Sequence, residues 1–339
     1  MTKQFLMGNY VLAQAAKEAG AKMMFGYPIT PSTEIMEKWA LFCSENKQLQ
    51  FLQAEDEMAA GFGLIGACLA GVPAFTATAG PGNVLMQDAF SMAEALRVPT
   101  VAMILQRGGL STSTVIYSQE EVRLTCYGGN GEGFRVVYST AGLQELYDYT
   151  FKAFQTAWRY RWPTFLLADG YQGKMMGEVA IKGGPVVKTE PLLTTTTNLR
   201  NCFNQEEEIG AIIKAYHLEY QKVRAQIEES ESLQTQGAKV VLLAHGIVAA
   251  AAKVAVAELR ARKKLVGLFR PITLRPFPRQ ACLEAIKSAQ KIVVIESAEG
   301  QLASLFKDEV LIPFPLIEYY KPAVGFTPEE IENEIAKIS

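Results

Sequence analysis

Four short segments of the sequence place polar or flexible residues directly after an apolar, strand-like run. In chain order they are YPITP (27–31), QAEDE (53–57), TATAGPG (76–82) and QRGG (106–109). Because ligands bind beyond the carboxyl ends of the strands in open parallel sheets, the four segments are expected to share one rim. That rim would offer hydroxyls, a carboxylate, a glycine turn and a guanidinium, which are groups that transfer protons and bind anions.

Each of these groups also has a purely structural explanation when it is taken alone. Glu55 could complement the dipole of the helix that follows it. The segment from Gly80 to Gly82 could be only a turn before a helix, and Arg107 could form a surface ion pair. The combination of four strand ends is what favours a ligand site.

Two prolines enclose Thr30 in the first segment. Proline is excluded from the interior of a central strand, and the residue before it is pushed toward extended geometry. The chain is therefore expected to leave a strand, make a rigid turn and begin a helix with Ser32 or Thr33 as the N-cap. The turn would either hold the Thr30 hydroxyl at the rim or only stabilise the sheet.

Strand-like and helix-like segments alternate through residues 1–182, which predicts an α/β fold whose mainly parallel sheet carries helices on both faces. Within this part, residues 1–20 read as an amphipathic helix. Residues 183–236 break the rhythm with an extended connector and a long polar helix. Residues 237–339 then add three strands and two helices. We therefore expect two open parallel-sheet domains, 1–182 and 237–339, joined by the connector.

The composition argues against several classes of protein. Of 339 residues, 49% are apolar, and 33 basic residues nearly balance 35 acidic ones, for a net charge of −2. No basic segment interleaved with aromatic residues points to nucleic acid, and no apolar run reaches the length of a membrane span. Without a signal-peptide pattern, a cytoplasmic location is expected. Five scattered cysteines, none in a C-x-x-C pair, and two histidines argue against an iron–sulfur cluster, a zinc site or histidine acid–base chemistry in this chain.

In order along the chain, the four segments resemble the alpha-subunit pattern of 2-oxoacid:ferredoxin oxidoreductases, the thiamine diphosphate enzymes that oxidise 2-oxoacids with coenzyme A. The resemblance continues through YGGNGEGFRVVYS (127–139), ADGYQGKM (168–175) and VGLFRPITLRPFP (266–278), and so covers most of the chain. It implies a thiamine pyrimidine-binding domain over residues 1–182 and a transketolase C-terminal-like domain over residues 237–339.

The resemblance also implies roles for residues at the rim. A family glutamate that hydrogen-bonds N1′ of the pyrimidine, and so helps to remove the thiazolium C2 proton, falls on Glu55, with Asp56 and Glu57 as near alternatives. Arg107 is expected to bind the substrate carboxylate, which suits a planar guanidinium. Thr30 is expected to face the cofactor and the 2-oxoacid. The expected catalytic residues are Glu55, Thr30 and Arg107, and the expected cofactor contacts are Tyr27, Pro28, Ile29, Thr30, Glu55 and Gly80.

Thiamine diphosphate also needs a diphosphate and metal site, which in related enzymes is usually Gly-Asp-Gly followed by a distant asparagine. Asp169-Gly170 with Asn198 fits that spacing, but the sequence after Asp169 does not read as the helix that a diphosphate requires, so we reject this match. The segment GGNGEG (128–133) is likewise read as a loop and not as a dinucleotide site. We therefore expect half a cofactor site and no metal ligands in this chain. A beta subunit would supply the diphosphate and Mg²⁺ site, and partner subunits, including gamma and ferredoxin-like chains, would carry the iron–sulfur clusters that pass electrons to ferredoxin.

The substrate prediction rests on the loop after Arg107. From Gly108 to Val122 this loop contains no Lys or Arg, whereas family members associated with 2-oxoglutarate tend to carry a lysine there. The loop therefore favours a branched-chain or aromatic 2-oxoacid, unless Arg123 or Lys174 folds back or a partner supplies a charge. The alternatives are 2-oxoglutarate or pyruvate as the substrate, a non-redox thiamine decarboxylase or transketolase-like half, and a non-catalytic α/β scaffold.

Overall fold

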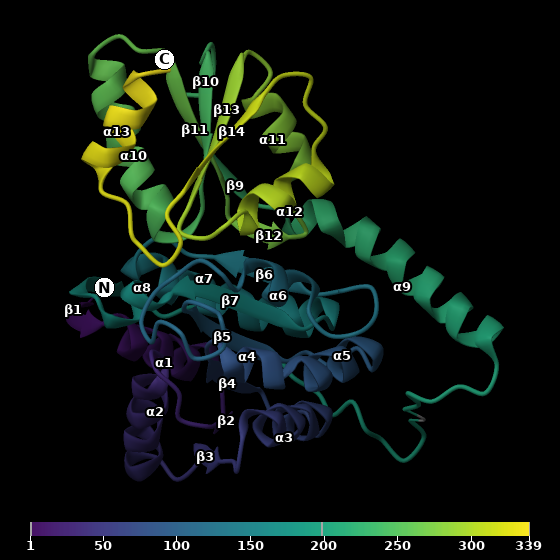
Figure 1. The fold of residues 1–339 in the computed structure, drawn as a ribbon. Helices are drawn as coiled ribbons and strands as arrows, with labels where there is room; N and C mark the ends of the chain where they lie inside the picture. The colour runs from purple at the N-terminus through teal and green to yellow at the C-terminus, as the bar shows by residue number, and fades with distance from the viewer. Residues whose placement is uncertain (1, 198, 339) are drawn as a thin grey trace.

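A computed structural model describes residues 2–197 and 199–338, which form two stacked units (Figure 1). The first unit is built around a seven-stranded sheet. Its strands, in chain order, are β2 (Met23–Gly26), β3 (Gln50–Gln53), β4 (Ala74–Thr78), β5 (Val101–Gln106), β6 (Val136–Ser139), β7 (Thr164–Asp169) and β12 (Thr273–Arg275). They lie in the order β12-β6-β7-β5-β4-β2-β3, and every neighbouring pair is parallel except β12 and β6. The central strands β4, β5 and β7 are mainly apolar and fully buried, as expected for a parallel sheet that is covered on both faces.

Helices cover both faces of this sheet. In chain order they are α1 (Gly8–Ala19), α2 (Thr33–Glu45), α3 (Glu57–Leu69), α4 (Pro81–Leu85), α5 (Gln87–Ala95), α6 (Val122–Tyr127), α7 (Leu143–Tyr160) and α8 (Gly170–Lys174). Because successive strand residues point to opposite faces, Met24 packs with α1, α2 and α7, whereas Phe25 packs with α3, α5 and α6. The predicted α/β fold with a mainly parallel sheet is confirmed.

The N-terminal segment differs from the sequence prediction. The helix expected over residues 1–20 begins only at Gly8, and Thr2–Met7 instead forms strand β1, which pairs antiparallel with β8 (Met176–Ile181). The helix prediction was wrong for β1 because the partner strand lies far along the chain. A local apolar pattern carries no information about such a partner.

The connector leads into the long helix α9 (Glu206–Ile227), which runs along the side of the molecule in Figure 1. A second sheet follows, with strands β9 (Ser230–Leu233), β10 (Val240–Leu243), β11 (Val266–Pro271), β13 (Lys291–Glu296) and β14 (Leu316–Tyr320). They lie in the order β14-β13-β10-β11-β9 and are parallel except for β9. The accompanying helices are α10 (Gly246–Ala261), α11 (Arg279–Ala285), α12 (Gln301–Glu309) and α13 (Pro328–Ala336). Among the described helices, none combines the length and the apolar character that a membrane crossing needs.

Three strands and two helices of the second unit match the sequence prediction, whereas β9, β14, α12 and α13 were not predicted. The two missed strands lie at the edges of the sheet, and their residues are largely half-exposed. They therefore lack the buried apolar run by which the central strands are recognised.

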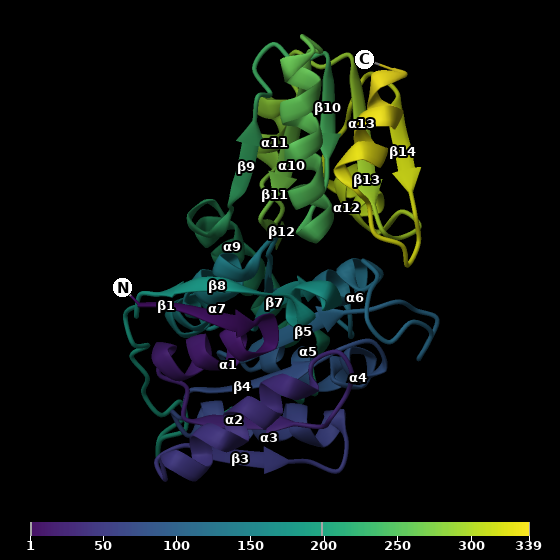
Figure 2. The ribbon, with the colours of Figure 1, turned by 90° about the vertical axis from the view of Figure 1, so that its left-hand side faces the viewer.

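The two units are joined by a strand pairing and by an ion pair whose arginine is buried. Strand β12 lies beyond residue 237, yet it extends the first sheet beside β6. The buried guanidinium of Arg270, on β11, lies 2.5 Å from a carboxylate oxygen of Glu145, on α7. Figure 2 shows the second unit stacked on the first along this seam. The domain boundaries at 182 and 237 stay a prediction.

Candidate active site

The carboxyl ends of β2, β4 and β5 bring three of the predicted site residues together. Arg107 follows β5 directly, and its Nη1 donates a hydrogen bond to the main-chain oxygen of Thr30, 2.6 Å away. Its side chain crosses the turn at Gly80, where a Cβ atom would lie 2.7 Å from Arg107 Nε. Gly80 also has φ +50° and ψ −119°, which an L side chain rarely adopts. The turn therefore needs glycine both for its backbone and for the guanidinium above it.

The guanidinium of Arg107 is fixed but keeps unused donors. The residue is 4% exposed, and burial lowers the pKa of Arg107 while the nearby carboxylates of Glu121 and Glu57 oppose that shift. Its Nε is buried without a partner. In the part of the chain that the structure describes, Nη2 makes no hydrogen bond either. Nη2 is therefore the donor through which this guanidinium could still receive an anion, and a carboxylate suits a guanidinium best.

A buried carboxylate lies beside this guanidinium, and it belongs to Glu57. The Glu57 side chain packs over Gly82, where a Cβ atom would meet Glu57 Oε1 at 2.5 Å and Thr78 Oγ1 at 2.1 Å. Burial raises the pKa of Glu57, and the charge of Arg107 partly offsets this. The Thr78 hydroxyl is buried without a hydrogen-bond partner. This corner of the rim therefore holds a carboxyl group suited to proton transfer and a hydroxyl that is still unpaired.

The other two acidic residues of the QAEDE segment are placed differently. Glu55 is exposed, whereas Asp56 is the N-cap of α3 and its Oδ1 accepts a hydrogen bond from the main-chain nitrogen of Ala59, 2.7 Å away. The geometry thus brings Glu57 to the buried corner, and it does not bring Glu55 there. A sequence signal for this existed, because an aspartate is a preferred N-cap and places the next residue in the first turn of the helix.

The proline turn after β2 is held from two sides. Ser32 occupies the N-cap position of α2, but its hydroxyl donates to the main-chain oxygen of Ile29 at 2.9 Å instead of capping the helix. The buried Asn9, on α1, donates to the main-chain oxygen of Pro31 at 2.7 Å. Tyr27, Pro28 and Thr30 remain exposed, and Ile29 is half-buried. The turn is therefore held by hydrogen bonds on its buried side, while its exposed residues face solvent at the rim.

Asp169 faces the second unit. The prediction that no helix follows Asp169 was wrong, because α8 begins at the next residue. The carboxylate, however, is buried and accepts hydrogen bonds from Gln106 Nε2 at 3.0 Å and from the main-chain nitrogen of Ile247 at 2.5 Å. Asn198, the other half of the rejected motif, lies outside the described residues. Among the residues that are described, no group of three or more His, Cys, Asp or Glu side chains could hold a metal ion.

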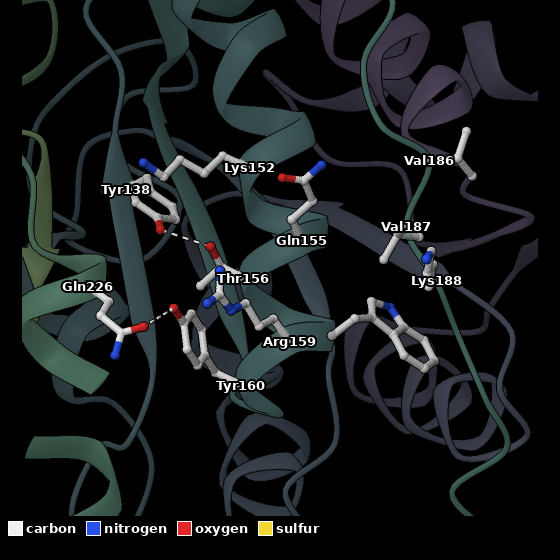
Figure 3. A pocket seen from close by; sticks show the side chains of 11 residues that line it. Tyr138, Lys152, Gln155, Thr156, Arg159, Tyr160, Val186, Val187, Lys188 and Gln226 are labelled. Carbon is white, nitrogen blue, oxygen red and sulfur yellow. Dashed lines mark hydrogen bonds between the residues drawn. The ribbon is translucent and has the colours of Figure 1, made fainter. Parts of the chain in front are cut away.

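A cavity of about 450 Å³ lies away from the rim, between α7 and the connector (Figure 3). Its walls include Lys152, Arg159 and Val187, and the Tyr160 hydroxyl donates a hydrogen bond to Gln226, which also lines the cavity. None of the predicted site residues lines this cavity. The rim at the carboxyl ends of β2, β4 and β5 is therefore the better candidate for an active site.

Comparison with protein families gives two matches that together span most of the chain. Residues 14–240 match the family described as pyruvate flavodoxin/ferredoxin oxidoreductase, thiamine diphosphate-binding. Residues 238–312 match core domain II of pyruvate:ferredoxin oxidoreductase. The two matches overlap at residues 238–240.

Curated relatives are similar over nearly the whole chain. Ketoisovalerate oxidoreductase subunit VorB of Methanothermobacter marburgensis is 31% identical, over 89% of this chain and 88% of the relative. The 2-oxoglutarate synthase subunit KorA of Methanocaldococcus jannaschii is 30% identical, over 89% of this chain and 90% of its own. Pyruvate synthase subunit PorA of the same organism is 26% identical, over 86% and 81%. The three names carry three different substrates.

Solved structures show the same fold. A 2-oxoglutarate:ferredoxin oxidoreductase from Magnetococcus marinus superposes with a TM-score of 0.91 at 23% identity, over 99% of this chain and 65% of that one. The chain thus spans about two thirds of the length of that protein. A split-gene transketolase superposes with a TM-score of 0.59 at 15% identity, over 97% of this chain and 96% of that one.

Proposed function

Because the chain belongs to the family of thiamine diphosphate-binding subunits of 2-oxoacid:ferredoxin oxidoreductases, we propose that it is the alpha subunit of an enzyme that converts a 2-oxoacid and coenzyme A into acyl-CoA and carbon dioxide. The electrons would leave through iron–sulfur clusters in partner subunits to ferredoxin. The observation that carries the proposal is the Arg107 guanidinium, which lies over the Gly80 turn beside the buried carboxyl of Glu57 and keeps donors unused.

The residues at this corner fit the pyrimidine of thiamine diphosphate. When bound, this cofactor supplies a carbon nucleophile and an electron sink. We assign the hydrogen bond to pyrimidine N1′ to Glu57 in place of Glu55, because Glu57 is buried with a raised pKa and can hold or release a proton there. The unpaired Thr78 hydroxyl and the space over Gly82 belong to the same corner. Tyr27, Pro28, Ile29 and Gly80 remain proposed contacts of the cofactor.

Arg107 and Thr30 are proposed to bind the 2-oxoacid. Nη2 makes no hydrogen bond to the described residues and is proposed to donate to the carboxylate that all 2-oxoacids share, while Nη1 stays on the Thr30 carbonyl and Nε lies buried beside the Gly80 turn. Thr30 is exposed at the end of a turn that Asn9 and Ser32 hold in place. Its hydroxyl would therefore meet a bound substrate with little reorganisation, which lowers the barrier by prior orientation.

The remaining half of the cofactor site is proposed to come from a partner. The Asp169 carboxylate accepts hydrogen bonds from this chain's own groups, so it is not assigned to a metal. We propose that a beta subunit supplies the diphosphate and Mg²⁺ site, and that gamma and ferredoxin-like subunits complete the electron path. Curated relatives are named as a subunit of an oxidoreductase and a subunit of a synthase, which supports an assembly of this kind. The cytoplasmic location stays a prediction.

For the substrate we propose a 2-oxoacid with a branched-chain or aromatic side chain, with 2-oxoglutarate or pyruvate as alternatives. The relatives do not decide this, since their names cite ketoisovalerate, 2-oxoglutarate and pyruvate. Two cations could have served a second carboxylate, but Arg123 pairs with Asp308, and Lys174 pairs with Glu34. The loop after Arg107 exposes Leu110 and offers no cation of its own.

The test is to purify the chain with its partner subunits and to measure reduction of a low-potential dye that depends on both a 2-oxoacid and coenzyme A. We expect turnover only in the complete complex, with acyl-CoA formed as product. Decarboxylation without coenzyme A or an electron acceptor would instead favour a non-redox thiamine enzyme. A complex that lacks turnover with every 2-oxoacid would favour the scaffold.

A further inference from the structure

A second buried carboxylate, that of Glu121, lies behind the site and makes three hydrogen bonds to it. Glu121 precedes α6 and is 4% exposed. Its Oε1 accepts from the main-chain nitrogens of Gly80, at 2.8 Å, and of Arg107, at 2.9 Å. Its Oε2 accepts from Asn83 Nδ2 at 2.9 Å. One side chain thus contacts both strand-end segments that carry the proposed carboxylate-binding group.

The hydrogen bonds from Gly80 and Arg107 to Glu121 lie beyond the point where strands β4 and β5 stop pairing. The ladder between β4 and β5 ends at the pair Thr78 and Ile104, so Gly80 and Arg107 both lie beyond it. A single carboxylate oxygen then bridges their main-chain nitrogens. Because the Arg107 side chain also packs directly on Gly80, the bridge sets how far the guanidinium extends over the turn.

Burial raises the pKa of Glu121, while the hydrogen bonds from Arg107, Gly80 and Asn83 oppose that shift. The amides around Glu121 show why both of its oxygens must accept hydrogen bonds, as they do in the ionised form. Asn83 uses its amide oxygen to accept from Gln87, and Gln87 uses its own amide oxygen to accept from Arg135. A neutral amide at position 121 would present N–H groups to the N–H groups of Asn83. If the side-chain amides of Asn83 and Gln87 were both rotated by 180° to relieve this clash, the N–H groups of Gln87 would face the N–H groups of Arg135 instead. Arg135 has donors only, so the clash would remain. The network therefore requires an acceptor at both oxygens of residue 121.

We propose that Glu121 is a positioning residue for the substrate, which holds Arg107 against the Gly80 turn in the geometry that receives the 2-oxoacid carboxylate. This inference rests on the proposed function. Glu121 does not contact the substrate itself, because its oxygens already accept hydrogen bonds from the protein. Loss of the Glu121 carboxylate should therefore weaken binding of the 2-oxoacid more than it slows turnover of the bound substrate. It should leave the binding of coenzyme A unchanged.

The experiment compares steady-state kinetics of the assembled complex for wild type, Glu121→Gln and Glu121→Asp. The first variant keeps the reach of the side chain but loses the charge, and the second keeps the charge but loses the reach. We expect both to raise KM for the 2-oxoacid by about tenfold or more, since hydrogen bonds to charged groups are involved, with a smaller change in kcat and an unchanged KM for coenzyme A.

The matched control is Glu296→Gln. Glu296 is also a buried carboxylate that accepts hydrogen bonds from main-chain nitrogens, those of Leu302 and Ala303, but it lies in the second unit. It should lower the thermal stability as Glu121→Gln does and leave KM unchanged. If either assembled Glu121 variant keeps the wild-type KM, or if Glu296→Gln raises KM equally, the inference is overturned. A wild-type complex without 2-oxoacid turnover would refute the proposed function instead.

Discussion

Arg107 and Thr30 are joined by a hydrogen bond of 2.6 Å from the guanidinium to a main-chain oxygen, although they follow strands that are not neighbours. Strand β4 lies between β2 and β5, and it contributes the Gly80 turn over which the Arg107 side chain passes. The guanidinium and the proline turn therefore fix each other's position. A change at one of them should be felt at the other.

The first prediction separates Glu57 from Glu55. Glu57→Gln keeps the shape of the side chain but removes its acid–base function, so we expect the assembled complex to bind thiamine diphosphate and to lose about 100-fold or more in kcat. Glu55→Gln, at an exposed position, should stay near wild type. The measurement is 2-oxoacid-dependent dye reduction together with cofactor content. Loss of turnover in Glu55→Gln with normal turnover in Glu57→Gln would restore the sequence-based assignment.

The second prediction concerns the planar fork of Arg107. Arg107→Lys keeps a charge, but a single ammonium cannot hold the Thr30 carbonyl and also present paired donors to a carboxylate. We expect kcat/KM for the 2-oxoacid to fall roughly 10- to 100-fold. Arg123→Lys is the control, because Arg123 pairs with Asp308 at the surface. An Arg107→Lys complex with wild-type kcat/KM would remove Arg107 from carboxylate binding.

The third prediction concerns pH and the seam between the two units. Burial raises the pKa of Asp169 to about 7. Between about pH 4, where an aspartate of the unfolded chain ionises, and about pH 7 the folded state therefore binds more protons than the unfolded state, and stability falls as pH rises. An asparagine at position 169 does not titrate, so the Asp169→Asn variant lacks this contribution to the pH dependence of stability. We expect the stability of Asp169→Asn, relative to wild type, to improve from pH 5 to pH 8.

Urea unfolding of the chain at several pH values measures this difference. The exposed Glu37→Gln serves as the control, and its stability relative to wild type should not vary over the same range. The other titrating groups are the same in the variant and in wild type, so their contributions to the pH dependence of stability cancel in the comparison. A gap between Asp169→Asn and wild type that does not move with pH would show that Asp169 ionises as it does in the unfolded chain.

The elements that the sequence predicted well are those whose signal is local. The central strands are buried apolar runs, and the helices between them have one apolar face, so the α/β fold and the rim at the strand ends follow from pattern alone. Strands β1 and β12 could not be found in this way. Each exists because a distant segment, β8 or β6, offers it an edge to pair with.

The candidate site was predicted as a set of segments, and its individual residues depended on side-chain direction. QAEDE supplies three acidic residues, and the start of α3 sends one to solvent, uses one as a cap and buries one. Glu121 carries no motif and lies in a loop, so only the contacts to Gly80 and Arg107 single it out. Local spacing can identify a rim, but the identity of a buried group depends on the packing around it.

The last prediction concerns the substrate. A dicarboxylate such as 2-oxoglutarate needs a second cation beside Arg107, because a buried carboxylate without a partner costs several kcal/mol. The loop from Gly108 to Val122 has none, Lys174 is held by Glu34, and Arg123 is held by Asp308. We therefore expect kcat/KM of the assembled complex to be higher for 2-oxoisovalerate or an arylpyruvate than for pyruvate, and lowest, by about a hundredfold or more, for 2-oxoglutarate.

Two variants make this comparison sharper. Lys174→Met and Arg123→Gln remove the two nearby cations one at a time, and neither should change the order of the four substrates if those side chains stay on Glu34 and Asp308. A selective loss of 2-oxoglutarate turnover in either variant would show that the cation leaves its partner to bind the substrate. Preference for 2-oxoglutarate in wild type and in both variants would place the second cation on a partner subunit, because this chain would then have no other basic side chain in the loop to supply it. In that case the pocket for the substrate side chain is completed by the partner subunit, as the diphosphate site is proposed to be. The uncharged loop from Gly108 to Val122 then forms only this chain's half of that pocket.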